Sequence, residues 1–139
     1  MHTYSVQFRL SGKSLDPHEV TRRLGLEPSQ IRVAGEKRGT NKAWDESLWA
    51  FDGNPEPRGT AKEWTSLEEG LSVVLNKLAP KKALIQSYVD DGVESIWWCG
   101  HFQSAFDGGP TLSASLLRQL ADFGFPLFID NYFSESPQT

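Results

Sequence analysis

The side chains best suited to chemistry in this sequence lie in three segments of alternating polarity, residues 4–10, 94–104 and 127–133. Successive side chains of a β-strand point to opposite faces, so each segment has one plainly apolar face. The other face is predicted to combine aromatic rings with charged and amide groups, namely Arg9, Trp97, His101, Gln103, Phe128, Asp130 and Tyr132.

Rings beside a few polar groups are typical of a ligand-binding surface or a protein interface. The alternative is that the long connection over residues 27–46, which carries Trp44, folds over these rings and buries them. If the first and last strands are neighbours, Arg9 and Asp130 could form an ion pair on this face. Trp97 is expected to contribute more to binding than to folding, because its side of the strand is assigned away from the core.

A catalytic hypothesis places His101 at the centre of a pocket. Arg9, His101 and Asp130 would converge there, with His101 as general base. Cys99 and His101 share a strand face and could form a nucleophile with its base, or two metal ligands. Side by side on a strand they are poorly placed for proton transfer, and no third ligand is near in sequence. A packed thiol and a hydrogen-bonded histidine are therefore favoured, with no catalytic residue, metal or cofactor assigned.

Two charged clusters offer weaker hypotheses. A flexible basic loop could hold a phosphate group through its side chains and backbone amides, but it lacks the spacing of a known phosphate loop. The basic residues are Arg32, Lys37, Arg38 and Lys42. The acids Asp90, Asp91 and Glu94 surround Gly92 without the ligand pattern of a calcium loop. A solvated loop and a solvated turn are the favoured interpretations.

Composition narrows the class of protein. The chain has 139 residues, a formal net charge of −4 and one cysteine, Cys99. No intramolecular disulfide can form, and no basic tail favours nucleic acid. No apolar run approaches the ~20 residues of a membrane helix, and no secretory leader is expected. The predicted location is the cytoplasm.

The elements that must position these side chains can be assigned from periodicity and capping residues. A strand over 4–10 precedes a helix that begins at Asp16-Pro17 and ends at Gly25. The other expected elements are a mostly irregular connection over 27–46, a strand over 47–52, a loop over 53–63, a helix begun by Ser66, a strand over 94–104, a helix from Ser113 to Gly124, a strand over 127–133 and a loose tail over 134–139.

The stretch over 80–91 is ambiguous. Leu84, Ile85 and Tyr88 fit one helical face, which favours a helix, and a strand turning at Asp91-Gly92 is the alternative. The order predicts one α+β domain over residues 1–139, with an ordered core of about 3–133. We expect a two-layer sandwich in which a roughly four-stranded, mostly antiparallel sheet carries helices on one face.

The order of motifs resembles a known family. The features that carry the likeness are Leu24-Gly25-Leu26-Glu27-Pro28-Ser29, Gly35-Glu36, an aromatic strand, a leucine-rich helix ending at Gly124, and Ile129-Asp130-Asn131-Tyr132. Over about residues 3–133 the chain resembles the bacterial domain of unknown function 4279. The resemblance implies a small α+β domain, usually standing alone. It implies no established reaction, so it assigns no catalytic residue.

The favoured hypothesis is a non-enzymatic binding or protein-interaction module that uses the mixed sheet face. A protein partner or a homodimer is expected, with a small-molecule ligand as a lesser alternative and neither nucleic acid nor membrane as partner. Toxin-immunity proteins offer an analogy for a compact acidic protein of this kind. The alternatives are a small enzyme with a pocket centred on His101, and a binder of phosphorylated ligands through the basic loop over 32–42.

Overall fold

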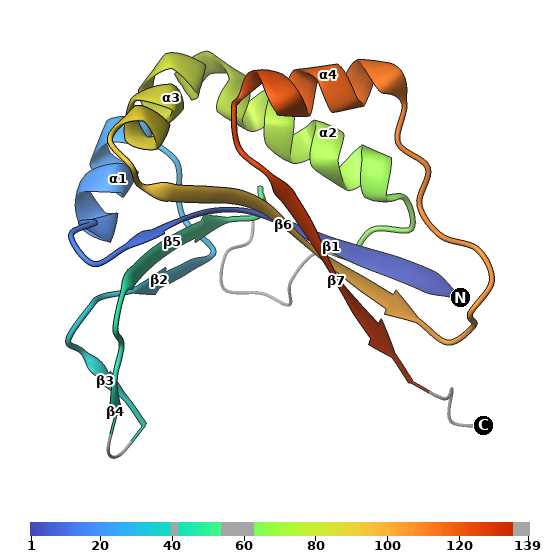
Figure 1. The fold of residues 1–139 in the computed structure, drawn as a ribbon, viewed down its shortest axis with the longest axis horizontal. Helices are drawn as coiled ribbons and strands as arrows, with labels where there is room; N and C mark the ends of the chain where they lie inside the picture. The colour runs from blue at the N-terminus through green and yellow to red at the C-terminus, as the bar shows by residue number, and fades with distance from the viewer. Residues whose placement is uncertain (40–41, 54–62, 135–139) are drawn as a thin grey trace.

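A five-stranded sheet carries helices on one side (Figure 1). The computed structural model describes residues 1–39, 42–53 and 63–134. The sheet has the order β2-β5-β1-β6-β7, and a separate two-stranded sheet pairs β3 with β4. The strands are β1 (His2–Gly12), β2 (Gln30–Arg32), β3 (Lys37–Arg38), β4 (Lys42–Ala43), β5 (Ser47–Phe51), β6 (Glu94–Gln103) and β7 (Leu127–Phe133). Among the strands of the described residues, only β6 and β7 pair in parallel, so the predicted α+β class with a mostly antiparallel sheet is confirmed.

Side-chain caps begin the helices where the sequence places them. The carboxylate of Asp16 accepts hydrogen bonds from the backbone N–H groups of His18 and Glu19, and the hydroxyl of Ser66 accepts one from Glu69. Such caps satisfy donors that a helix leaves without partners in its first turn. The helices are α1 (Pro17–Leu24), α2 (Leu67–Leu78), α3 (Lys82–Asp90) and α4 (Ala114–Asp122), with a short 3-10 turn at Ala79–Lys81. The favoured helix over 80–91 is therefore confirmed.

The connection over 27–46, predicted to be mostly irregular, contains three short strands that the prediction missed. β2 adds a fifth strand to the sheet by pairing with β5, and β3 and β4 form a small hairpin. Three residues are too few to show an alternation of polarity, so β2 is recognisable only by its pairing with a distant strand. The loop expected over 53–63 and the loose tail fall largely outside the described residues, at 54–62 and 135–139.

The core lies between the sheet and the helices. The alternate residues Tyr4, Val6, Phe8 and Leu10 of β1 are buried there, against buried leucines of α2 and α4. Trp49 of β5 joins the same cluster. Apolar burial of this kind is the main stabilising contribution to the fold. No helix of the described chain is long and apolar enough to cross a membrane.

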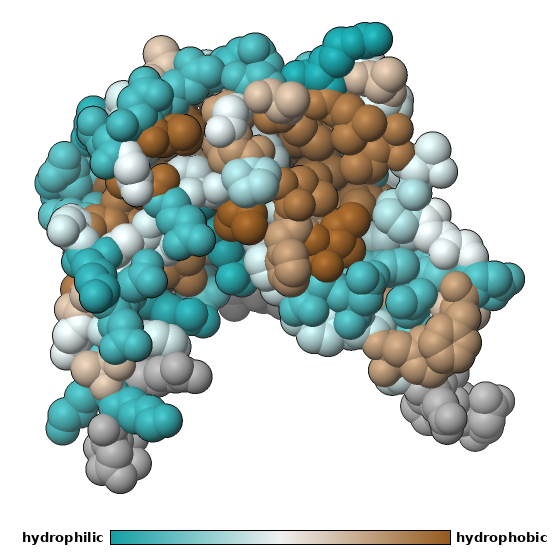
Figure 2. Space-filling model, viewed as in Figure 1, coloured by the Kyte–Doolittle hydropathy of each residue, from teal (hydrophilic) through white to brown (hydrophobic). Residues whose placement is uncertain are grey.

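The sheet face that points away from the helices is called the outer face below. Its residues on β1 and β2 are Gln7, Arg9, Gln30 and Arg32, and those on β6 and β7 are Ile96, Trp98, Phe102, Phe128, Asp130 and Tyr132. Figure 1 shows the β3–β4 hairpin and the C-terminal end of β7 projecting on this side, away from the helices. The space-filling view shows a hollow between the two projections (Figure 2).

Candidate functional site

The face predicted for three site residues is wrong. Trp97 pairs in register with Phe8, and His101 pairs with Tyr4, so both share the helix-covered face of β1. Trp97 is fully buried, and its ring contacts Phe123 and Phe125 with centroids 5.4 and 4.9 Å apart. Gln103, with the same alternation, lies on that face at the end of the strand. The sequence could not decide this, because β6 carries large apolar residues on both of its faces.

The histidine belongs to a polar chain at the edge of the core. His101 Nδ1 lies 2.8 Å from Asn131 Oδ1, and His101 Nε2 lies 2.8 Å from Nδ1 of His2. The other nitrogen of His2 donates to the carbonyl of Asp107 at 2.7 Å, and Tyr4 stacks on His101 with ring centroids 4.8 Å apart. Both ring nitrogens of His101 therefore have protein partners, and the residue links β1, β6 and β7.

The described residues do not form the catalytic pocket hypothesised around His101. Arg9 and Asp130 lie on the outer face, and His101 lies on the opposite side of the sheet. The neighbouring Cys99 is fully buried, and burial raises the pKa of its thiol to about 12. A thiol with such a pKa stays protonated at neutral pH and is a poor nucleophile. The convergence of Arg9, His101 and Asp130, and a reactive Cys99–His101 pair, are thus both contradicted by the geometry.

Arg9 and Asp130 do not pair either. β6 separates β1 from β7, so the two side chains are not cross-strand neighbours. Within the described chain no carboxylate lies within 4.0 Å of Arg9. Its Nε instead donates to Oε1 of Gln7 at 2.7 Å, and its guanidinium carbon lies 4.2 Å from the ring centroid of Trp98. Asp130 accepts a hydrogen bond from the hydroxyl of Tyr132.

Four aromatic rings lie on the outer face, on the two neighbouring strands β6 and β7. Phe102 and Tyr132 stack with centroids 5.0 Å apart and an interplanar angle of 11°. Phe102, Phe128 and Tyr132 are 37%, 45% and 42% exposed. The hypothesis that the connection over 27–46 buries the rings is therefore wrong for Phe128 and Tyr132. Trp98 is half-buried.

Trp98 and Phe102 were missed as site residues because the prediction placed Trp97, His101 and Gln103 of the same strand on the face away from the core. Gly100 between Trp98 and Phe102 carried a usable signal. A glycine inside a strand often marks a close approach by another group. The ring of Phe102 lies over this glycine, and a Cβ at position 100 would come within 3.1 Å of it.

A cavity of about 370 Å³ opens at the other end of the outer face. Arg9 and Trp98 form one part of its wall, and Arg32 and Trp44 form another, with the guanidinium of Arg32 4.2 Å from the Trp44 ring centroid. With its amide oxygen turned toward Arg32, Gln30 accepts hydrogen bonds from Nε and Nη2 at 3.1 and 3.0 Å. Burial lowers the pKa of Arg9, and the nearby charge of Arg32 lowers it further.

The basic loop does not form a single site. Arg32 lies on β2 in the cavity wall, whereas Lys37 and Lys42 are exposed on the hairpin. The side chain of Arg38 is outside the part of the chain that the structure describes. The acids are likewise divided, since Asp91 lines a different cavity from Glu94. Within residues 1–39, 42–53 and 63–134 no group of three or more histidine, cysteine or acidic residues could hold a metal ion.

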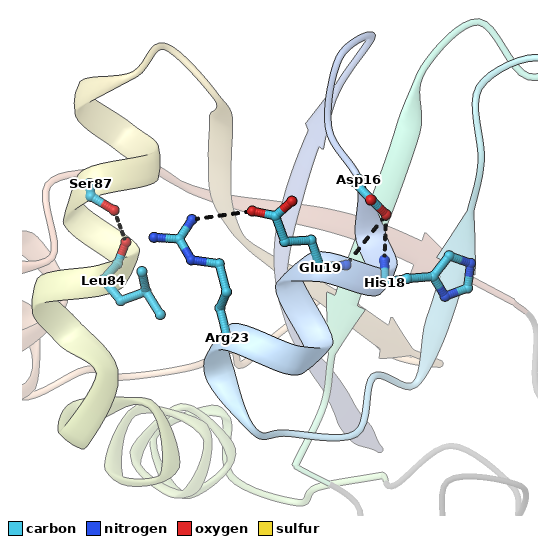
Figure 3. A network of polar contacts seen from close by, with 6 residues as sticks. All are labelled: Asp16, His18, Glu19, Arg23, Leu84 and Ser87. Atoms are coloured by element: carbon cyan, nitrogen blue, oxygen red, sulfur yellow. Dashed lines mark hydrogen bonds and ion pairs between the residues drawn. The ribbon is translucent and has the colours of Figure 1, made fainter.

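That other cavity, of about 480 Å³, lies beside the start of α1. Three of its polar side chains have structural roles (Figure 3): the Asp16 carboxylate caps α1, and Arg23 lies 3.9 Å from Glu19 one turn earlier on the same helix. The two ionic side chains are half-exposed, and exposed pairs of this kind contribute about 0–1 kcal/mol. This cavity therefore offers a weaker candidate than the outer face.

The fold and the outer face describe a small α+β protein whose exposed sheet surface combines rings with arginines. The chain belongs to the family described as domain of unknown function DUF4279, whose model matches residues 2–134. No curated protein and no solved structure gives a significant match to the chain. The family assignment agrees with the fold and defines no activity.

Proposed function

We propose that this protein is a non-enzymatic interaction module that binds another protein on its outer face. The observation that carries the proposal is the group of half-exposed rings on β6 and β7, which includes Phe128 and Tyr132. Contiguous exposed rings are uncommon on isolated soluble proteins and mark interaction surfaces. Aromatic residues and arginine are also the residue types enriched in protein interfaces.

The shape and charge of the surface support a convex protein partner. The outer face lies in a hollow between the β3–β4 hairpin and the end of β7 (Figure 2). Two such hollows would not close against each other, which favours a different protein over a second copy of this chain. The net charge of −4 is unfavourable for nucleic acid. We place the interaction in the cytoplasm, where a single buried thiol such as Cys99 would stay reduced.

Photocrosslinking inside the native cells tests the proposal. Phe128→p-benzoylphenylalanine places the reactive group on the outer face, and Leu117→p-benzoylphenylalanine places it on the exposed side of α4. The two positions are a matched pair, with exposed fractions of 45% and 49%. We expect one discrete heterologous adduct from position 128 and none from position 117. The adduct is identified by mass spectrometry, and the partner is then purified for binding measurements.

Affinity measurements between this protein and its purified partner test whether the outer face is the binding surface. Phe128→Ala and Tyr132→Ala are each expected to weaken binding about ten-fold or more, as interface aromatic residues commonly do. Leu117→Ala is expected to leave the affinity unchanged. Equal adducts from both positions would contradict the proposal. An adduct of twice the monomer mass, with a dimer in light scattering, would replace the heterologous partner by a homodimer.

A further inference from the structure

Arg9 is held in one orientation by its neighbours on the outer face. Its Nε donates to Gln7, and its guanidinium carbon lies over the Trp98 ring. These contacts leave the two terminal Nη groups without an acceptor among the described residues. When both Nη groups of a guanidinium are free and fixed in direction, they can donate two parallel hydrogen bonds to one carboxylate that approaches end-on.

Arg32 is held in the same manner at the side of the same cavity. The amide of Gln30 takes its Nε and one Nη, and the Trp44 ring lies against its guanidinium. Two arginines are thus each positioned by a glutamine and a tryptophan. The charge of Arg32 contributes to lowering the pKa of Arg9, so the two cations repel each other.

No close ion pair offsets this repulsion within the described chain. Arg9 and Arg32 are both half-buried, and neither has a carboxylate within 4.0 Å. Partly desolvated charges are costly when unpaired. An incoming anion would relieve the repulsion and satisfy the free Nη groups together.

The lining of the cavity selects among anions. Asp45, Glu46 and Glu94 line it together with the two arginines, so its formal charge is −1. A phosphate group or a strongly acidic segment would be repelled by these three carboxylates. A single negative charge placed directly on the guanidinium groups meets much less repulsion.

We infer that Arg9 and Arg32 bind one carboxylate group of the partner protein, from an aspartate or glutamate side chain or a chain terminus. This inference rests on the proposed function and adds the chemical group that the outer face recognises. The carboxylate lies against the Nη groups of Arg9, and the rings of Trp98 and Trp44 flank it. The partner's neighbouring residues are neutral or basic, because they face the three acids of the cavity.

Acetate is a direct probe of this site and needs no knowledge of the partner. The full chain, labelled with ¹⁵N, is titrated with sodium acetate at constant ionic strength while the arginine Nε–H and tryptophan indole N–H resonances are followed. Acetamide, which has nearly the same shape and no charge, is the matched control, and inorganic phosphate is the competing anion. We expect saturable shifts at Arg9, Arg32 and Trp98 with acetate, none with acetamide, and weaker effects with phosphate.

Substitution of each arginine tests which side chains bind the acetate. Arg9→Gln is expected to reduce the apparent acetate affinity at Arg32 and Trp98 about ten-fold or more, as loss of charge-assisted hydrogen bonds implies. Arg32→Gln, read at Arg9 and Trp98, gives a second measurement if the first variant folds poorly. Arg22→Gln, on the exposed surface of α1, is the control and should change nothing.

The outcomes separate this inference from the proposed function. Shifts that do not saturate, that acetamide reproduces, or that phosphate produces more strongly would overturn the carboxylate site. In that case a partner crosslinked from position 128 would still support the interaction module. Conversely, saturable acetate binding with no adduct from position 128 would support the carboxylate site and overturn the proposed interface.

Discussion

Trp97 and Trp98 are adjacent on β6, and their rings lie on opposite faces of the sheet. The ring of Trp97 is fully buried beside Phe8 and Phe125, with centroids 5.8 and 4.9 Å away. The ring of Trp98 lies on the outer face beneath the guanidinium of Arg9. The strand therefore divides two similar side chains between the core and the candidate binding surface.

Alanine substitution should separate the two roles. Trp97→Ala is expected to lower the free energy of unfolding by about 3–5 kcal/mol, because it leaves a large cavity in the core. Trp98→Ala removes a half-buried ring and a cation–π contact, so we expect a loss of about 1–2 kcal/mol. Urea unfolding measures both. Equal losses for the two variants would contradict the assignment of faces.

The thiol of Cys99 should be inert in the folded protein. Burial raises its pKa to about 12 from an ordinary value of 9.0, and the thiolate is the reactive form. We expect no reaction with 5,5′-dithiobis(2-nitrobenzoate) at pH 8 in buffer and complete reaction in urea. Rapid labelling under native conditions would show that the thiol is accessible.

The same pKa predicts a change of stability with pH. A group whose pKa is raised by folding stabilises the fold fully below its unfolded pKa and loses that contribution as the pH rises through the folded value. For Cys99 the decline runs from about pH 9.0 toward about 12. Cys99→Ala should lack this part of the decline, which paired urea titrations at pH 8 and 10.5 would measure. If the unmodified protein and Cys99→Ala lost the same free energy of unfolding between pH 8 and 10.5, the predicted contribution of Cys99 would be contradicted.

The hydroxyl of Tyr132 should ionise above the usual pH. Its hydrogen bond to Asp130 raises its pKa above 10.0, burial and the charge of that carboxylate raise it further, and the nearby Arg9 opposes the change. Asp130→Asn should bring the pKa back toward 10.0. Absorbance at 295 nm followed against pH measures the shift, and Tyr132→Phe identifies which step belongs to this residue. An unchanged step in Asp130→Asn would show that the contact does not govern the ionisation.

Gly70 on α2 should not tolerate alanine. A Cβ there would lie 2.8 Å from the Trp64 ring and 3.0 Å from a methyl group of Val6. We expect Gly70→Ala to destabilise the protein by about 1–3 kcal/mol through overpacking, although alanine is the better helix former. Asn76→Ala, on the exposed side of the same helix, should stay within about 0.5 kcal/mol. Thermal and urea unfolding test the pair, and a stabilised Gly70→Ala would contradict the close packing.

Local signals in the sequence were enough to predict most of the fold. Asp16, Ser66 and Ser113 cap helices as their positions indicate, because the bonds of a cap join residues two or three apart. The strict alternation over residues 4–10 likewise predicted which face of β1 is buried. These features depend on neighbours along the chain, so a single sequence contains them.

The tertiary structure decided what depends on distant neighbours. β2 is a strand because Gln30 and Arg32 pair with β5. A pattern of three residues is too short to predict such a strand from the sequence. Arg9 and Asp130 were predicted to be able to pair, but β6 lies between their strands.

The dependence on distant neighbours also explains why Trp97, His101 and Gln103 were assigned to the wrong face of the sheet. Alternation along β6 separated its residues correctly into two groups, one with Trp97 and His101 and the other with Trp98 and Phe102. Both groups contain large rings, so hydrophobicity could not say which one faces the helices. The register with β1 decides it, by placing Trp97 opposite Phe8 and His101 opposite Tyr4. A strand's own residues determine that it has two faces, and only the strand beside it determines which face is buried.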